Sequence, residues 1–299
     1  MSKLFEGSGV ALVTPFYKTK KGKLNVDYDA LKDLVKYHKK NKTDAIIICG
    51  TTGETPTLTD EEHIKTIKKC VEYANGKIPV IAGTGSNCTD KAVYFSKKAE
   101  YVGADGLLCV TPYYNKATQG GLVAHFSAIA DAVNIPIILY NVPSRTGCNI
   151  LPETAVKLCK EKKNIVAIKD ATGNMSQTIK MMQLADGCID LYSGDDDQIV
   201  PLMSVGGLGV ISVLANVAPA QTHEICQKCL EGDYQTARKL QFKAYPLVKA
   251  LFSEVNPIPV KSALKMIGFA AGPLHLPLTE MEPENCAKLK EEMKKFGLI

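Results

Sequence analysis

The chain has 299 residues, of which 45% are hydrophobic and 22% charged, so it carries enough apolar material for a substantial core. This composition excludes an intrinsically disordered protein. The formal charge of +5 comes almost entirely from lysine, because Arg145 and Arg238 are the only arginines. A nucleic-acid binder would typically show an arginine-rich stripe with interleaved aromatic residues, so we expect no nucleic-acid partner.

Hydropathy predicts how the chain relates to membranes. No apolar run approaches the roughly 20 residues that a membrane-spanning helix needs. Residues 1–7 lack the apolar stretch and the small-residue cleavage site of a signal peptide. We therefore expect a cytoplasmic protein without a membrane partner.

The 10 cysteines are spread along the chain, and Cys226-x-x-Cys229 is the only pair at the spacing of a metal or redox site. It lies in a helical pattern with no second pair nearby, so free thiols are favoured over zinc binding or a disulfide. The 5 histidines are isolated and form no HExxH pattern. We expect no metal site.

Short apolar runs alternate with longer amphipathic stretches along most of the chain. The runs predict eight strands, over Gly9–Thr14, Asp44–Cys49, Ile78–Gly83, Gly106–Thr111, Ile135–Asn141, Ile165–Asp170, Leu191–Gly194 and Val210–Leu214. Their nearly continuous apolar character is typical of parallel strands covered on both faces. Helical patterns between them include Tyr28–Lys40, Asp60–Ala74, Lys91–Val102 and Gly121–Val133. Thr59-x-x-Glu62 has the spacing of a capping box, and Pro152 suits the first turn of a later helix.

Strict alternation of strand and helix predicts an α/β fold with a parallel sheet. Eight units favour a closed (β/α)8 TIM barrel over residues 1–231, and no GxGxxG motif follows the first strand. Beyond it, helical patterns over Asp233–Phe252, Val260–Phe269 and Glu284–Phe296 predict a C-terminal helical domain, residues 232–299. We expect this short domain to lie against the barrel, because it is marginal for independent folding.

Active sites of such barrels form at the C-terminal ends of the strands, which makes Lys169 informative. Ala167 and Lys169 share one face of their strand. If Val166 and Ile168 face the helices, the lysine projects into the mouth of the barrel. Burial there would lower the pKa of its amine and favour a Schiff base with a carbonyl. The alternatives are a lysine that extends out of the rim or one paired with Asp170.

Other strand ends carry polar residues. Tyr140 could transfer protons during imine formation, or it could be a core tyrosine. Thr51 and Thr52 lie between two glycines in a turn that could hold a carboxylate, although a plain turn also explains the pattern. Arg145 could bind a carboxylate through its planar guanidinium or form a structural salt bridge.

Two further clusters follow strands. Tyr113 and Tyr114 could line a substrate site or a subunit contact. The run Asp195–Asp197 precedes a helix, so we expect it to cap that helix rather than to bind a metal.

Together these strand ends resemble the dihydrodipicolinate synthase family of the pyruvate-dependent class I aldolase superfamily. The resemblance covers essentially the whole chain and rests on the motifs Gly50–Glu54, Thr111–Asn115, Tyr140–Gly147, Ile168–Gly173 and Gly209–Val213. It implies a lyase that needs no cofactor and condenses pyruvate with L-aspartate 4-semialdehyde. The product, 4-hydroxy-tetrahydrodipicolinate, belongs to the diaminopimelate route to lysine.

The resemblance also implies catalytic roles. Lys169 would form the Schiff base with pyruvate, and Tyr140, Thr51 and Tyr114 would form a proton relay. Family members are usually homotetramers, built as a dimer of tight dimers. In them the residue at the position of Tyr114 reaches across a subunit interface into the neighbouring site.

Binding roles follow from the same resemblance. Thr51 and Thr52 would hold the carboxylate of pyruvate, and Arg145 would hold the carboxylate of the semialdehyde. The backbone groups of Gly194 and Ile211 would line the pocket.

Relatives that lysine inhibits carry an acidic residue and histidines in a pocket at the tight interface. At the corresponding positions this chain has Lys91 in place of the acid and Asp60 in place of one histidine, whereas His63, Asn87 and Tyr113 remain. Lys91 would repel the ammonium of a bound lysine. The resemblance therefore implies weak or absent feedback inhibition.

Two other functions are compatible with parts of the pattern. Another aldolase of the superfamily, such as an N-acetylneuraminate lyase or a keto-deoxy sugar acid aldolase, would share the lysine and the tyrosine. Arg145 and the run Lys169–Thr172 favour the synthase. A non-catalytic barrel would have lost the lysine, the tyrosine or the arginine, and all three are present.

Overall fold

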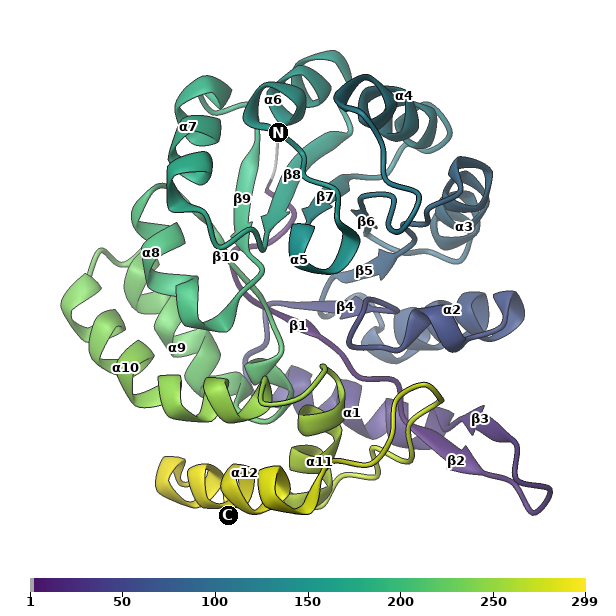
Figure 1. The fold of residues 1–299 in the computed structure, drawn as a ribbon, viewed down its shortest axis with the longest axis vertical. Coiled ribbons are helices and arrows are strands. Elements are labelled where there is room, and N and C mark those ends of the chain that lie inside the picture. Colours follow the sequence, from purple (N-terminus) through teal and green to yellow (C-terminus); the bar gives the residue numbers. More distant parts are fainter. Residues whose placement is uncertain (1–2) are drawn as a thin grey trace.

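The structure, a computed structural model that describes residues 3–299, contains a closed barrel of parallel strands surrounded by helices (Figure 1). Around the barrel the order is β1-β10-β9-β8-β7-β6-β5-β4, so each barrel strand lies beside the next barrel strand along the chain, and β10 closes the barrel against β1. The strands are β1 (Gly7–Ala11), β4 (Ala45–Ile48), β5 (Val80–Gly83), β6 (Gly106–Val110), β7 (Ile137–Asn141), β8 (Ile165–Asp170), β9 (Asp190–Ser193) and β10 (Gly209–Ser212). The predicted (β/α)8 barrel and its eight strands are confirmed.

Helices cover the outside of the barrel because each presents an apolar stripe to the strands. They are α1 (Tyr28–Lys40), α2 (Asp60–Ala74), α3 (Thr89–Tyr101), α4 (Gln119–Ala130), α6 (Pro152–Glu161), α7 (Met175–Ala185), α8 (Ile199–Ser204) and α9 (Pro219–Leu230). The short helix α5 (Pro143–Thr146) instead follows β7 at the mouth of the barrel. The Thr59–Glu62 capping box opens α2, and Pro152 begins α6, as predicted. Within residues 3–299, none of the helices combines the length and the apolar character that crossing a bilayer requires.

A short hairpin was not expected from the sequence. β2 (Phe16–Lys18) and β3 (Leu24–Val26) pair antiparallel outside the barrel, at the lower right of Figure 1. Each strand has only three residues, and a lysine-rich turn joins them. Strands this short are below the length at which alternation of apolar residues can be recognised.

The C-terminal extension consists of α10 (Tyr234–Leu251), α11 (Ile258–Met266) and α12 (Pro283–Phe296). These helices agree with the predicted ones to within about three residues, the usual uncertainty of helix ends. α10 lies against α9 and α12, and α11 contacts α12 and the segment after β10, so the extension covers one side of the barrel (Figure 1).

Side chains of the barrel strands separate into two buried groups. Outward-facing residues join the helices in the main core, and inward-facing residues such as Ile47, Ile81 and Tyr192 form a smaller cluster inside the barrel. This division follows from the two-residue period of a strand.

The alternation along β8 differs from the prediction at one position. Ala167 lies in the interior cluster and Ile168 in the outer core, as predicted. Val166 is instead partly buried against the interior cluster. The pairing of β7 with β8 shifts register between Ile137 and Ile138, and such an irregularity redirects neighbouring side chains.

An aromatic pair closes the N-terminal end of the barrel. The ring of Tyr192 on β9 stacks on that of Phe5 at a centroid distance of 4.3 Å. The Tyr192 hydroxyl donates a hydrogen bond of 2.6 Å to the Phe5 carbonyl, and Tyr192 is fully buried. Because Tyr192 is also the register partner of Lys169, this pair supports the floor beneath the predicted site.

We expect Tyr192→Phe to lower the free energy of unfolding by about 1–3 kcal/mol, because it leaves the buried Phe5 carbonyl without a donor. Urea denaturation followed by circular dichroism measures this change. Tyr101→Phe removes the same atom from a side chain that is 86% exposed and is the matched control. Equal losses in the two variants would contradict the prediction.

Candidate active site

A cavity of about 190 Å³ opens at the C-terminal ends of the barrel strands. Its walls come from segments that follow β4, β7, β8 and β9 and from the C-terminal extension. All strands of a parallel barrel end on the same side, so residues distant in the sequence meet here. The cavity brings together the predicted residues Thr51, Thr52, Tyr140, Arg145, Lys169 and Gly194.

Lys169 near the end of β8 is buried and lies beside Tyr140, its register partner on β7. The Lys169 Nζ atom is 4.3 Å from the centre of the Tyr140 ring. Burial lowers the pKa of Lys169 to about 8, although the nearby carboxylates of Asp195 and Asp196 oppose this effect. About a tenth of the amine is therefore uncharged at pH 7, far more than for a lysine with the ordinary pKa, and the uncharged form is the nucleophile.

Neither alternative for Lys169, a side chain that extends out of the rim or one paired with Asp170, fits its position. The side chain is 6% exposed, so it does not extend out of the rim. The carboxylate of Asp170 binds elsewhere: it accepts hydrogen bonds from the Thr178 hydroxyl at 2.6 Å and from the Thr172 N–H at 2.9 Å. Asp170 thus fixes the start of α7 and the loop before it.

Tyr140 belongs to the buried interior cluster and also lines the cavity. Burial raises the pKa of Tyr140 to about 12, while the Arg145 guanidinium and the Thr51 hydroxyl act in the opposite direction. The phenol therefore stays protonated at neutral pH and can donate a proton.

The segment after β4 is a tight turn. The Gly53 N–H donates to the Gly50 carbonyl and the Glu54 N–H donates to the Thr51 carbonyl, both at 3.1 Å. Thr52 is buried, and its hydroxyl accepts a hydrogen bond of 2.9 Å from the Asn256 side chain. The turn thus presents Thr51 and Thr52 to the cavity.

Asn256 and Phe252 line the cavity from the C-terminal extension, and sequence reasoning missed both. The Asn256 Oδ1 atom is buried and finds no hydrogen-bond partner among residues 3–299. An acceptor in this position is available to a polar ligand. No sequence signal pointed to either residue, because they follow a helix rather than a strand.

Gly194 provides space for the lysine. A Cβ atom at this position would lie 2.6 Å from the Cβ of Ala171 and 3.1 Å from the Cε of Lys169. Any larger residue would therefore compete with the lysine side chain for the same volume.

The prediction that Asp195–Asp197 cap a helix is wrong. The Asp195 side chain makes no capping bond to the short helix η2 (Asp196–Gln198) and instead faces the cavity, where burial raises its pKa to about 6. The Asp196 carboxylate is buried and accepts hydrogen bonds from the N–H groups of Val213 at 3.0 Å and Leu214 at 2.8 Å. Barrel closure brings this run against the segment after β10, and no local pattern predicts that.

Three other predicted residues have different surroundings. Arg145 lies on α5, and its exposed side chain lines the cavity wall. Ile211 is buried in the interior cluster with Tyr140 and Ala171, so its backbone contact with substrate stays a prediction. Tyr114 is 91% exposed, and its role in a neighbouring subunit also stays a prediction.

A groove of about 380 Å³ shares Thr51, Tyr140 and Arg145 with the cavity. The groove also contains the residues that the sequence assigns to a regulatory pocket: Asp60, His63, Asn87, Lys91 and Tyr113. The His63 ring is buried, which lowers its pKa, and it bonds to the Gly83 carbonyl at 2.8 Å. Because burial favours the neutral form of His63, the charged side chains among these five residues are those of Lys91 and Asp60.

Both residues of the Cys226-x-x-Cys229 pair are free thiols on α9. Burial raises the pKa of each thiol, to about 11 for Cys229. They contribute to the main core.

Residues 4–296 match the Dihydrodipicolinate synthetase family. The chain is 56% identical over 296 residues to the 4-hydroxy-tetrahydrodipicolinate synthase of Lachnoclostridium phytofermentans, and the match covers 99% of each chain. The chain belongs to the dihydrodipicolinate synthetase family.

Solved structures of dihydrodipicolinate synthases have the same fold as this chain. The chloride-inhibited dihydrodipicolinate synthase of Acinetobacter baumannii, complexed with pyruvate, has a TM-score of 0.94 and 45% identity, over 98% of this chain and 99% of that chain. The enzyme of Cyanidioschyzon merolae with lysine bound has a TM-score of 0.96 and 40% identity, over 100% of both chains. The predicted family, fold and activity, a lyase that condenses pyruvate with L-aspartate 4-semialdehyde in lysine biosynthesis, are confirmed.

We expect the rate of imine formation at Lys169 to rise about tenfold for each unit of increasing pH below pH 8 and to level off above it, because only the uncharged amine attacks. Borohydride trapping of the pyruvate adduct at several pH values measures this profile. Asp195→Asn removes a carboxylate that raises the Lys169 pKa, so the midpoint should move to lower pH.

Asp197→Asn is the matched control, since its carboxylate belongs to the same run but is not among the groups that shift the pKa of Lys169. A midpoint that stays in place in Asp195→Asn, or that moves upward, would contradict the prediction.

Proposed function

We propose that Lys169 is the nucleophile of this synthase. Its uncharged amine adds to the C2 carbonyl of pyruvate, and the carbinolamine loses water to form an imine. The imine nitrogen draws electrons, so a methyl proton leaves and an enamine forms. The enamine carbon attacks the aldehyde of the semialdehyde, and ring closure by the semialdehyde amine releases Lys169.

We propose that Tyr140, Thr51 and Tyr114 move the protons of these steps. The protonated Tyr140 phenol donates to the departing hydroxyl of the carbinolamine. Thr51 lies beside it on the cavity wall. Tyr114, exposed on its loop, would be supplied by a second copy of the chain in a homotetramer. We propose that this assembly acts in the cytoplasm.

The carboxylates of the substrates have separate binding groups in this proposal. The hydroxyl and N–H groups of Thr51 and Thr52 hold pyruvate, with the backbone of Gly194 and Ile211 beside it. Arg145 holds the carboxylate of the semialdehyde, because its planar fork binds two oxygens at once. We assign the catalytic barrel to residues 1–231 and a supporting helical domain to residues 232–299.

The observation that carries the proposal is the buried amine of Lys169, with its pKa near 8, next to Tyr140 in a cavity with a polar turn. Reduction with borohydride in the presence of pyruvate, followed by peptide mass mapping, tests it. We expect the adduct on the peptide that contains Lys169, and none in Lys169→Arg. An adduct on another lysine, or no adduct at all, would overturn the proposal.

A substrate turnover assay separates the synthase from other aldolases of the superfamily. Pyruvate with L-aspartate 4-semialdehyde should turn over, whereas cleavage of sialic acid should not. Arg145 favours the synthase, because it places a second carboxylate-binding group at the cavity wall.

We also propose weak or absent inhibition by lysine, because the Lys91 ammonium lies in the groove where the ammonium of a lysine inhibitor would bind. We expect less than about a twofold loss of activity at millimolar lysine. A steady-state assay beside the Cyanidioschyzon merolae enzyme, whose structure holds lysine, provides the comparison. A clear loss of activity in this chain would contradict the proposal.

A further inference from the structure

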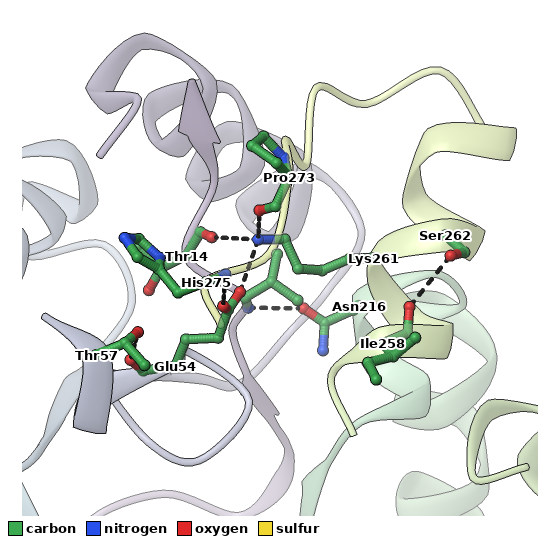
Figure 2. Close-up of polar contacts among 10 residues, drawn as sticks. Thr14, Glu54, Thr57, Asn216, Ile258, Lys261, Ser262, Pro273 and His275 are labelled. Atoms are coloured by element: carbon green, nitrogen blue, oxygen red, sulfur yellow. Dashed lines mark hydrogen bonds and ion pairs between the residues drawn. The ribbon is translucent and has the colours of Figure 1, made fainter. Parts of the chain in front are cut away.

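A buried ion pair links the Thr51–Thr52 turn to the C-terminal extension. The Lys261 Nζ atom on α11 lies 2.7 Å from a carboxylate oxygen of Glu54, the residue that ends the turn. The two side chains are 1% and 0% exposed. Figure 2 shows the lysine reaching from α11 into a space between the turn, the end of β1 and the loop after α11.

Each N–H group of the Lys261 ammonium has an acceptor. Besides Glu54, it donates to the carbonyls of Pro273 at 2.7 Å and Thr14 at 3.2 Å. The second carboxylate oxygen of Glu54 accepts a hydrogen bond of 3.0 Å from the backbone N–H of His275. These partners come from separate segments of the chain, so together they fix the position of both charges (Figure 2).

The turn has local hydrogen bonds but an unfavourable backbone conformation at its last residue. Besides the two bonds of 3.1 Å described above, the Thr55 hydroxyl donates to the Gly50 carbonyl at 2.9 Å and the Thr57 N–H donates to the Glu54 carbonyl at 3.0 Å. Glu54 itself adopts a left-handed conformation with φ of 55°, which is unfavourable for a residue with a Cβ atom. Tertiary contacts must therefore hold it. The extension supplies two of them, the ion pair and the bond from Asn256 to Thr52.

We propose that Glu54 and Lys261 are positioning residues that hold Thr51 and Thr52 in the geometry that receives the carboxylate of the keto acid. The extension is then a part of the pyruvate site, not only a cover for the barrel. This inference rests on the proposed function, in which the turn binds pyruvate.

The energetics of buried ion pairs agree with a positioning role. Removing two charges from water costs much of what their attraction returns, so such a pair contributes little net stability compared with apolar residues of similar size. Removal of one partner alone leaves an uncompensated buried charge and destabilises the fold. A test must therefore remove both charges together.

The test is the double variant Glu54→Gln/Lys261→Met in the full-length chain. The glutamine amide keeps an oxygen for the His275 N–H, and the methionine keeps most of the volume of the lysine. The measured quantities are the thermal midpoint, the KM for each substrate, kcat, and the pyruvate concentration that gives half of the borohydride-trapped Lys169 adduct. Lys265→Met, an exposed position on the same helix, is the matched control.

We expect the KM for pyruvate and the half-trapping concentration to rise by about tenfold or more, with the KM for the semialdehyde changed by less than about twofold. The control should match the wild type. A folded double variant with unchanged pyruvate dependence would overturn the inference, and so would an equal rise in both KM values. If the wild type forms no Lys169 adduct, the proposed function itself fails, which is a separate outcome.

Discussion

The proposed chemistry of this site depends on one amine that is buried without being paired to a neighbouring carboxylate. Burial lowers the pKa of Lys169 to about 8, and the opposing carboxylates of Asp195 and Asp196 prevent a larger decrease. Both effects are set by the barrel, which closes below the lysine through Tyr192 and Phe5 and places it beside Tyr140. A hydrated lysine would keep its ordinary pKa of about 10.4 and would be almost entirely cationic at neutral pH.

Polar groups around this amine are held by partners that do not compete for it. Asp170 binds Thr178 and Thr172, and Asp196 binds the backbone after β10. These hydrogen bonds offset the free-energy cost of burying the two carboxylates, which would be high without donors. The lysine is left facing the cavity, where a carbonyl substrate can reach it.

The C-terminal extension completes the cavity that the barrel begins. Phe252 and Asn256 form part of its wall, and Lys261 anchors the turn that carries the polar hydroxyls. These contacts join residues more than 200 positions apart, as in the Lys261–Glu54 bond. The extension therefore forms part of the proposed active site as well as packing against α9.

The sequence by itself determined the barrel and most of the residues in its mouth. Apolar runs and helical periods are local patterns, and parallel strands necessarily bring their ends together, so Lys169, Tyr140 and Thr51 could be placed in one site. Only the tertiary structure decided what Asp195, Asp196 and Asn256 contact, how Val166 is turned, and that Glu54 pairs with Lys261. Each of these depends on distances between distant segments or on a register shift, and neither leaves a periodic signal along the chain.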